Sequence, residues 1–325
     1  MEARGAGLLA RLREPSGPGQ PGLREDDLAA MELRLDEPMA KHTTLRLGGP
    51  ADLWARPRTI AAARALLAAC RGAELPVHFV GSGTNLLVRD GGLRGVVINL
   101  GRINRVWRPA PDQHPTRVDV EAGASTGRLL TQATAWSLGG VEFLGGVPGS
   151  VGGGLIMNAG TYLGEFTDVV TEVRSLDRDG REITRDHAAC GFRYRASELP
   201  REEIVIAATL ELRPRPREEI EAEVAGLRKR RHEREPKGVP NNGSTFKNPE
   251  GDYAGRLIEA AGLKGARRGG AVVSTKHANW LVVDREVAPA CTAADLLALI
   301  EHVRAEVEGH SGVRLETEVE IIGED

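Results

Sequence analysis

Two short glycine-rich segments constrain this chain more than any other feature. Residues 81–85 read Gly-Ser-Gly-Thr-Asn and follow the apolar run at 77–80, and residues 145–160 contain seven glycines. Glycine has no Cβ, so it allows sharp turns and a close approach of the backbone to a ligand. Because glycine at this density disfavours a regular helix or strand, we expect both segments to be loops.

The first of these loops suits a phosphate or pyrophosphate. Consecutive backbone N–H groups in a sharp turn after a strand can converge on an anion. The loop lacks the GxxxxGK[ST] spacing of a P-loop, and residues 86–88 continue as a predicted strand instead of the helix that follows a Rossmann GxGxxG motif. Taken alone, the loop is also consistent with a glycine-rich hairpin.

The composition is that of a globular protein with more than one module. The 325 residues exceed one typical domain, and 41% of them are hydrophobic and 27% charged. A net charge of -3 gives no general attraction to nucleic acid or to acidic membranes. No apolar run approaches the roughly 20 residues that span a bilayer. These properties predict a cytoplasmic protein with no nucleic-acid partner and no membrane insertion.

The cysteines agree with a reducing compartment. Cys70, Cys190 and Cys291 are far apart in the sequence and have no CxxC spacing. Such spacing gives neither a metal knuckle nor an evident disulfide framework. We therefore expect no metal site.

The sequence pattern predicts an α+β fold with an N-terminal extension and two domains. Residues 1–37 mix proline, glycine and alternating charges without a sustained period, which predicts a mobile extension. The Arg-Pro-Arg-Pro run at 213–216 marks a boundary because proline excludes continued strand pairing. The predicted domains are residues 38–215, with lobes at about 38–100 and 101–215, and residues 216–325.

Several elements carry recognisable signals. Thr59 and Ser125 each precede a helical segment as N-cap residues, and Thr292 with Asp295 has the capping-box spacing. Ile220 opens an i, i+4, i+7 apolar pattern that predicts a further helix. Strands are predicted at 77–80, 86–88, 96–98, 117–121, 169–176, 204–212 and 317–322.

The two glycine clusters together carry a specific resemblance. GSGTNLLVRD at 81–90 and GVPGSVGGGLIMNAG at 146–160 resemble the FAD-binding fold of the vanillyl-alcohol-oxidase type, and in particular the UDP-N-acetylenolpyruvoylglucosamine reductase family. The likeness covers nearly everything after residue 38 in collinear order. It continues through HTTLRLGGPA at 42–51, CGFRYRAS at 190–197, GSTFKNP at 243–249, AGRLIEAAGLKG at 254–265, STKHANWLV at 274–282 and LETEVEIIG at 315–323.

This resemblance implies an NADPH-dependent flavoenzyme that reduces the enolpyruvyl ether of a UDP-sugar in peptidoglycan precursor synthesis. It implies a two-lobed FAD-binding domain followed by a smaller substrate-binding domain. Several oxidases of this fold tether the flavin through a histidine, but neither glycine cluster contains one, so FAD is expected to be non-covalent. The residues assigned to FAD are Gly81, Ser82, Gly83, Thr84, Asn85, Leu86, Gly146, Val147, Pro148, Gly149, Ser150, Gly152, Gly153, Asn158 and Gly160.

Three residues are catalytic by the same resemblance. Ser244 matches the family's proton donor. A serine can fill this role because a carbanionic intermediate is basic enough to take its proton. Without the resemblance it reads as a turn serine. Arg195 matches the arginine that steadies the developing negative charge, and a guanidinium can grip a carboxylate in a bidentate way. Glu318 matches the glutamate that orients or polarises the intermediate, although Glu316 and Glu320 share its side-chain parity in the predicted strand.

Binding of the UDP-sugar is assigned by the resemblance to one tyrosine and several polar or basic side chains. They are Tyr194, Arg234, Lys247, Asn248, Lys276 and His277. Only residues 198–203 separate the arginine motif from the next predicted strand. The chain thus resembles the shorter subtype of the family, and no tyrosine lid is expected.

Two other functions are consistent with parts of the sequence. A flavin-dependent oxidase of the same fold, acting on an alcohol or a sugar lactone, explains both glycine clusters. It does not explain the motifs at 190–197, 243–249 and 315–323. A non-catalytic protein that binds a nucleotide sugar would retain the scaffold, but all three catalytic residue types are present.

Overall fold

The computed structural model describes residues 4–15, 22–286 and 290–325. The described chain divides into two compact units, each assembled from three stretches. Unit 1 contains the described residues up to Glu37, Asp52–Ser82 and Gly95–Lys229; unit 2 contains Pro38–Ala51, Gly83–Arg94 and the described residues of Arg230–Asp325. The division differs from the contiguous domains expected at 38–215 and 216–325, because two early segments belong to the same unit as the C-terminal residues.

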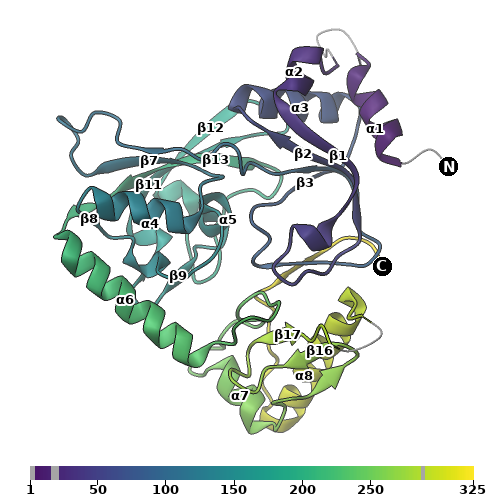
Figure 1. The fold of residues 1–325 in the computed structure, drawn as a ribbon, viewed down its shortest axis with the longest axis vertical. Coiled ribbons are helices and arrows are strands. Elements are labelled where there is room, and N and C mark those ends of the chain that lie inside the picture. Colours follow the sequence, from purple (N-terminus) through teal and green to yellow (C-terminus); the bar gives the residue numbers. More distant parts are fainter. Residues whose placement is uncertain (1–3, 16–21, 287–289) are drawn as a thin grey trace. The chain divides into compact units, whose positions relative to one another are not determined.

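The first sheet of unit 1 has four strands, of which the two at one edge are parallel to each other (Figure 1). Thr59 caps the helix α3 (Ile60–Gly72), since its hydroxyl accepts a hydrogen bond from the Ala62 N–H at 3.1 Å. The predicted cap is therefore confirmed. The strand order is β1 (Met31–Pro38), β2 (Pro50–Pro57), β5 (Leu93–Ile98) and β3 (Val77–Phe79).

The N-terminal region differs from the mobile extension expected for residues 1–37. It forms α1 (Arg4–Arg13) and α2 (Glu25–Ala29), which both contact α3, and then β1. Leu12, Leu23 and Met31 are buried in the core of unit 1. Burial of each such side chain contributes about 1.5–3 kcal/mol. Residues 1–3 and 16–21 lie outside the described residues.

The sequence gives no sign of this docking because each short element supplies at most one buried apolar side chain. Leu12 is the buried apolar residue of α1, and Met31 is the first residue of β1. A periodic signal requires several apolar positions within one element. Single anchors in successive elements leave no such period.

The second sheet of unit 1 is antiparallel and is contacted by two helices, one of which lies in the glycine-rich region (Figure 1). The cap at Ser125 is confirmed, because its hydroxyl accepts from the Arg128 N–H at 3.1 Å and begins α4 (Thr126–Ala135). The helix α5 (Val151–Ile156) contacts β7 and β13. The strand order is β12 (Glu182–Asp186), β11 (Val170–Leu176), β13 (Ile204–Glu211), β7 (Arg117–Glu121) and β6 (Val106–Trp107).

The helix α5 corrects the expectation that residues 145–160 contain no regular element. Its N-cap is Ser150, whose hydroxyl accepts from the Gly153 N–H at 3.4 Å. A Cβ on Gly152 would lie 3.0 Å from the Ala122 Cβ, and a Cβ on Gly154 would overlap the Phe166 ring. The glycines thus allow a short helix to approach the sheet closely, and this packing outweighs their low helix propensity.

Unit 2 combines a three-stranded antiparallel sheet with two helices (Figure 1). The strands are β15 (Arg267–Arg268), β16 (Ala271–Val273) and β17 (Leu281–Val283), and the helices are α7 (Ala254–Ala260) and α8 (Ala293–Ser311). The predicted capping box is confirmed: Thr292 Oγ1 accepts from the Asp295 N–H at 3.1 Å, and Asp295 Oδ2 accepts from the Thr292 N–H at 3.0 Å.

A second acidic residue, distant in sequence, also caps α8. The two Asp90 carboxylate oxygens accept from the Ala293 and Ala294 N–H groups, each at 2.9 Å. Nearby in the chain, β4 (Leu86–Val88) pairs in parallel with β18 (Glu320–Ile322). The segment 83–94 is therefore attached to the last helix and the last strand of unit 2.

The remaining elements are short, apart from α6 (Arg217–Arg234). The apolar pattern from Ile220 is confirmed, since Ile220, Val224 and Leu227 are buried. No helix in the described part of the chain is long and apolar enough to cross a membrane. The other elements are the strand pairs β8 (Leu138–Gly139) with β14 (Arg213–Pro214) and β9 (Gly160–Thr161) with β10 (Gly164–Glu165), and the 3-10 turns Met39–Lys41, Glu142–Leu144, Phe166–Asp168 and Ala188–Cys190.

Candidate active site

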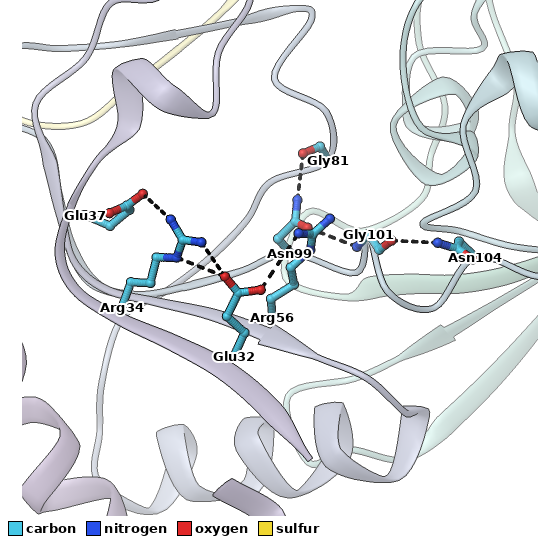
Figure 2. A network of polar contacts seen from close by, with 8 residues as sticks. All are labelled: Glu32, Arg34, Glu37, Arg56, Gly81, Asn99, Gly101 and Asn104. Atoms are coloured by element: carbon cyan, nitrogen blue, oxygen red, sulfur yellow. Dashed lines mark hydrogen bonds and ion pairs between the residues drawn. The ribbon is translucent and has the colours of Figure 1, made fainter. Parts of the chain in front are cut away.

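A buried asparagine fixes the entry to the first glycine loop. The Asn99 side-chain amide donates to the carbonyls of Val80 and Gly81, both at 2.8 Å. Its Oδ1 accepts from the Gly101 N–H at 3.0 Å, as Figure 2 shows. Sequence reasoning missed Asn99, although a polar residue directly after the apolar strand at 96–98 was a visible signal. Because Asn99 is buried, its three hydrogen bonds hold the turn rigidly.

A charged group beside Asn99 ties β1 to β2 (Figure 2). Glu32 on β1 accepts from Arg34 Nε at 2.9 Å and lies 3.9 Å from Arg56 Nη1 on β2. The hydrogen bond from Arg34 lowers the pKa of Glu32, although burial opposes this effect. Strand β1 therefore contributes polar as well as apolar contacts to unit 1.

The two glycine clusters meet in unit 1. A Cβ on Gly81 would overlap the hydroxyl oxygen of Ser150, so a side chain there would displace the hydroxyl that caps α5. The exposed residues here are Gly81, Ser82, Gly146, Pro148 and Gly153, whereas Ser150 and Gly152 are buried. Exposed backbone from both clusters thus borders one surface without bulky side chains, and this is a cradle that fits a dinucleotide such as FAD.

The second half of the first loop belongs to unit 2. Gly83 has φ +62°, and a Cβ there would overlap the His42 carbonyl, so this position requires glycine. Asn85 Nδ2 donates to the Glu318 carbonyl at 2.9 Å, and the Glu320 N–H donates to the Asn85 carbonyl at 3.0 Å. The strand predicted at 317–322 is shorter in the structure, because β18 begins at Glu320 and Glu318 lies just before it. Asn85, predicted as a cofactor residue, holds this segment through its side chain and its carbonyl, and Leu86 pairs with Glu320.

The segments that carry Ser244 and Glu318 lie together in unit 2. The Glu318 N–H donates to the Thr245 carbonyl at 2.8 Å, and Phe246 forms an antiparallel bridge with Thr317. The structure also separates the three glutamates that the strand pattern left open. Glu316 and Glu320 are exposed, whereas Glu318 is half-buried. This burial favours Glu318 as the functional carboxylate.

The amide side chain of Asn279 secures the Ser244 segment. Its Oδ1 accepts from the Phe246 N–H at 3.0 Å, and its Nδ2 donates to the Phe246 carbonyl at 2.8 Å. The Asn279 carbonyl accepts from the Thr245 N–H at 2.8 Å. Asn279 is 3% exposed, so these hydrogen bonds are shielded from water. Sequence reasoning missed this residue, although it lies within the motif at 274–282.

Most of the predicted substrate residues also have partners within unit 2. Lys276 Nζ donates to the His232 carbonyl at 2.9 Å, and Lys247 Nζ lies 3.4 Å from Glu316 Oε2. Asn248 Oδ1 accepts from the Ala254 N–H at 3.1 Å and so caps α7. These contacts place the polar ends of Lys247, Asn248 and Lys276 without showing a ligand role.

His277 is the predicted substrate residue whose charge state is most affected. Burial lowers its pKa, and the nearby positive charges of Lys264 and Arg234 lower it further. The Asn279 N–H donates to His277 Nδ1 at 3.3 Å. The imidazole is therefore biased towards its neutral form.

Arg195 lies in unit 1, in a tight turn next to the exposed Tyr194. Its backbone has φ +54°, a left-handed conformation that is unusual for a residue other than glycine. Its guanidinium donates to the Gly160 carbonyl at 3.2 Å, lies 3.8 Å from Glu165 Oε1 and stacks 5.2 Å above the Tyr194 ring centre. Glu165 was not singled out from the sequence. Asn158, predicted as a cofactor residue, is almost fully buried.

Comparison with known proteins decides the family. Residues 235–322 match the C-terminal domain of UDP-N-acetylenolpyruvoylglucosamine reductase, and residues 51–185 match an FAD-binding domain. The UDP-N-acetylenolpyruvoylglucosamine reductase of Moorella thermoacetica is 44% identical over 294 residues, which cover 90% of this chain and 94% of the relative. The chain belongs to the UDP-N-acetylenolpyruvoylglucosamine reductase family. The enzyme of Syntrophomonas wolfei is 38% identical, with 92% and 98% covered.

A solved member of this reductase family confirms the expected fold class. The crystal structure of the reductase from Thermus caldophilus aligns with a TM-score of 0.74 and 34% identity, and the alignment covers 90% of this chain and 98% of that one. The α+β architecture and the FAD-binding domain are thus confirmed. As a member of this family, the present chain is an FAD-dependent oxidoreductase of cell-wall synthesis.

Proposed function

We propose that this enzyme reduces UDP-N-acetylenolpyruvoylglucosamine to UDP-N-acetylmuramate in the cytoplasm, with NADPH as the reductant. The observation that carries the proposal is the hydrogen bonding of the Ser244 segment to the Glu318 segment, where the Glu318 N–H donates to the Thr245 carbonyl at 2.8 Å. Family membership supplies the substrate class.

The backbone of the two glycine clusters would hold FAD. Exposed main chain at Gly81, Ser82 and Gly146 offers N–H groups without bulky neighbours. When bound there, FAD would supply the redox chemistry, a hydride transfer from NADPH to the enolpyruvyl methylene carbon. The protein then has to orient the substrate, stabilise charge and deliver a proton.

The catalytic side chains divide these tasks. Hydride addition at the methylene leaves negative charge on the neighbouring carbon and its carboxylate, and the Arg195 guanidinium stabilises that charge. Ser244 Oγ holds the proton that the carbon then takes. Glu318 orients this end of the substrate from a half-buried position in a segment that Asn85 and Thr245 fix in place.

The UDP group is bound by basic and amide side chains. Arg234, Lys247 and Lys276 supply positive charge for the diphosphate. A neutral His277 can accept or donate a hydrogen bond without adding charge, consistent with its lowered pKa. Tyr194 and Asn248 complete the proposed set.

The absorption spectrum of the flavin tests this function. Anaerobic NADPH should bleach the flavin of the purified enzyme, and the enolpyruvyl UDP-sugar should restore its colour. Bleaching by an alcohol or a sugar lactone, with colour restored only by oxygen, would instead identify an oxidase. A colourless protein that binds the UDP-sugar but takes up no FAD would identify a non-catalytic binding protein.

A further inference from the structure

Asn158 uses its whole side chain inside unit 1. Its Nδ2 donates to Glu165 Oε2 at 2.7 Å and to the Arg193 carbonyl at 3.1 Å, and its Oδ1 accepts from the Thr167 N–H at 2.9 Å. The residue is 1% exposed. An asparagine amide has two donor hydrogens, and both are used here. The side chain therefore has no donor left for a cofactor.

The two partners of Asn158 Nδ2 are both connected to Arg195. The Arg193 carbonyl also accepts from the Ala196 N–H at 3.1 Å, and the Ala196 carbonyl accepts from the Arg193 N–H at 2.9 Å. These bonds close the turn in which Arg195 takes its left-handed φ of +54°. Such a conformation is strained and persists only when surrounding contacts enforce it.

Glu165 connects Asn158 to the arginine side chain itself. Its Oε2 is held by Asn158, and its Oε1 lies 3.8 Å from Arg195 Nη1. On its other side the guanidinium donates to the Gly160 carbonyl at 3.2 Å. The Arg195 and Glu165 side chains are 20% and 28% exposed, so water only partly screens this charge pair.

We propose that Asn158 and Glu165 are positioning residues for Arg195: Asn158 fixes the turn and the carboxylate, and the carboxylate fixes the guanidinium. The proposal rests on the function proposed above, in which Arg195 stabilises the charge that develops on the substrate. It replaces the expected cofactor role of the Asn158 side chain. A guanidinium that is hydrogen-bonded on one side and has a carboxylate 3.8 Å away on the other needs less reorientation when charge develops, which is the basis of preorganised stabilisation.

The first test compares Glu165→Gln with a matched control on the same turn. Glu198→Gln removes the exposed carboxylate that pairs with Arg193 at 2.9 Å and leaves Glu165 in place. Rapid mixing should show Glu165→Gln slowing flavin reoxidation by the UDP-sugar about 10- to 100-fold, as expected for a misplaced catalytic group. The effect should fall on kcat more than on KM, and flavin reduction by NADPH should be unchanged. Glu198→Gln should stay within about twofold of wild type.

A double-variant cycle separates positioning from a general structural effect. Because Glu165 acts through Arg195, adding Glu165→Gln to Arg195→Ala should slow reoxidation no further than Arg195→Ala alone. Additive losses would overturn the positioning role. The positioning role would also be overturned if Glu165→Gln and Glu198→Gln reoxidised the flavin at the same rate while Arg195→Ala was slow. If Arg195→Ala itself reoxidised at the wild-type rate, the proposed function of Arg195 would fail, and the positioning role with it.

Asn158→Asp then distinguishes the positioning role from a cofactor role. Aspartate keeps the acceptor for the Thr167 N–H but has no donor for Glu165 or Arg193. We expect slower reoxidation and a dissociation constant for FAD within about threefold of wild type, a free-energy change well under the ~1.4 kcal/mol of a tenfold change. The proposal would be refuted if the dissociation constant for FAD rose tenfold or more while the FAD-loaded enzyme was reoxidised at an unchanged rate. If this variant does not fold, the Glu165 variants decide.

Discussion

The two units hold their proposed catalytic groups in different ways. In unit 2, the chain around Ser244 is bound largely through main-chain groups, which pair with the Glu318 segment and with Asn279. In unit 1, main-chain bonds between Arg193 and Ala196 close the Arg195 turn, and the side chains of Asn158 and Glu165 tie this turn to neighbouring segments. Main-chain hydrogen bonds survive most substitutions, whereas side-chain hydrogen bonds are lost with the residue that makes them. Unit 1 is therefore expected to be more sensitive to single substitutions around its catalytic residue.

The largest expected effect concerns the stability of unit 1. Deleting residues 1–37 removes β1 together with the buried side chains of Leu12, Leu23 and Met31. This loss is the opposite of what a mobile extension, as expected from the sequence, would show. Leu12→Ala alone should lower the free energy of unfolding by about 2–5 kcal/mol, and the deletion by more. Denaturant unfolding followed by circular dichroism measures both.

The matched control for this prediction is Leu9→Ala, since Leu9 is only half-buried on the same helix. It should cost clearly less than Leu12→Ala. A truncated protein as stable as the full chain would show that unit 1 does not need its first strand.

A large kinetic effect is expected at Ser244. Ser244→Ala should leave flavin reduction by NADPH near its normal rate, because no proton from this serine is used in that step. Reoxidation by the enolpyruvyl substrate should slow by about 10²- to 10⁴-fold, the range for losing a positioned general acid. Rapid-mixing absorbance separates the two half-reactions. Wild-type reoxidation would return Ser244 to the role of a turn residue.

A smaller effect should follow from weakening the side-chain contact of unit 2. Asn279→Asp keeps the acceptor for the Phe246 N–H and removes the donor to the Phe246 carbonyl. A buried acceptor left without a partner costs about 1–3 kcal/mol of stability. Reoxidation should slow less than in Glu165→Gln, because the main-chain bonds from Thr245 remain. Asn241→Asp, at an exposed hydrogen bond, is the control.

The smallest effect is the pH dependence of unit 2. The pKa of His277 is lowered from 6.5 in the folded state, mainly by burial, so the unfolded chain binds the proton more readily. Stability from this residue is complete above the unfolded pKa and is lost as the pH falls below it. Between pH 7.5 and 5.5, wild type should therefore lose slightly more stability than His277→Gln. Equal losses in urea titrations would show that His277 ionises as freely as in the unfolded chain.

Local signals in the sequence predicted local structure well. Thr59, Ser125 and Thr292 cap the helices that their positions indicated, because an N-cap interacts only with the next turn. The expectation that residues 145–160 form no helix was wrong for α5, because close packing against Ala122 and Phe166 from distant segments outweighs the low helix propensity of glycine. Helix and strand signals thus succeeded wherever the deciding contacts are close in sequence.

The candidate site shows the complementary limit. The resemblance selected both Ser244 and Glu318, whereas strand parity alone left Glu316 and Glu320 open; the folded unit adds that Glu318 is half-buried and the other two are exposed. Glu165 and Asn279 were missed because Arg195 and Phe246, which they contact, lie 30 and 33 positions away in the chain. Such pairings have no periodic pattern and become visible only when distant segments are brought together.

The path of the chain also imposes an order on biosynthesis. Every residue of unit 1 has been synthesised once the ribosome has passed Lys229. In contrast, β4 cannot pair until its parallel partner β18 has been synthesised, and Asp90 cannot cap α8 until Ala293 has been synthesised. Because domains fold as units and earlier parts of the chain emerge first, unit 1 can complete its core while β4 and Asp90 still lack these partners. A nascent chain stalled before Glu320 would therefore carry an unpaired β4 strand, the kind of edge that chaperones protect from aggregation.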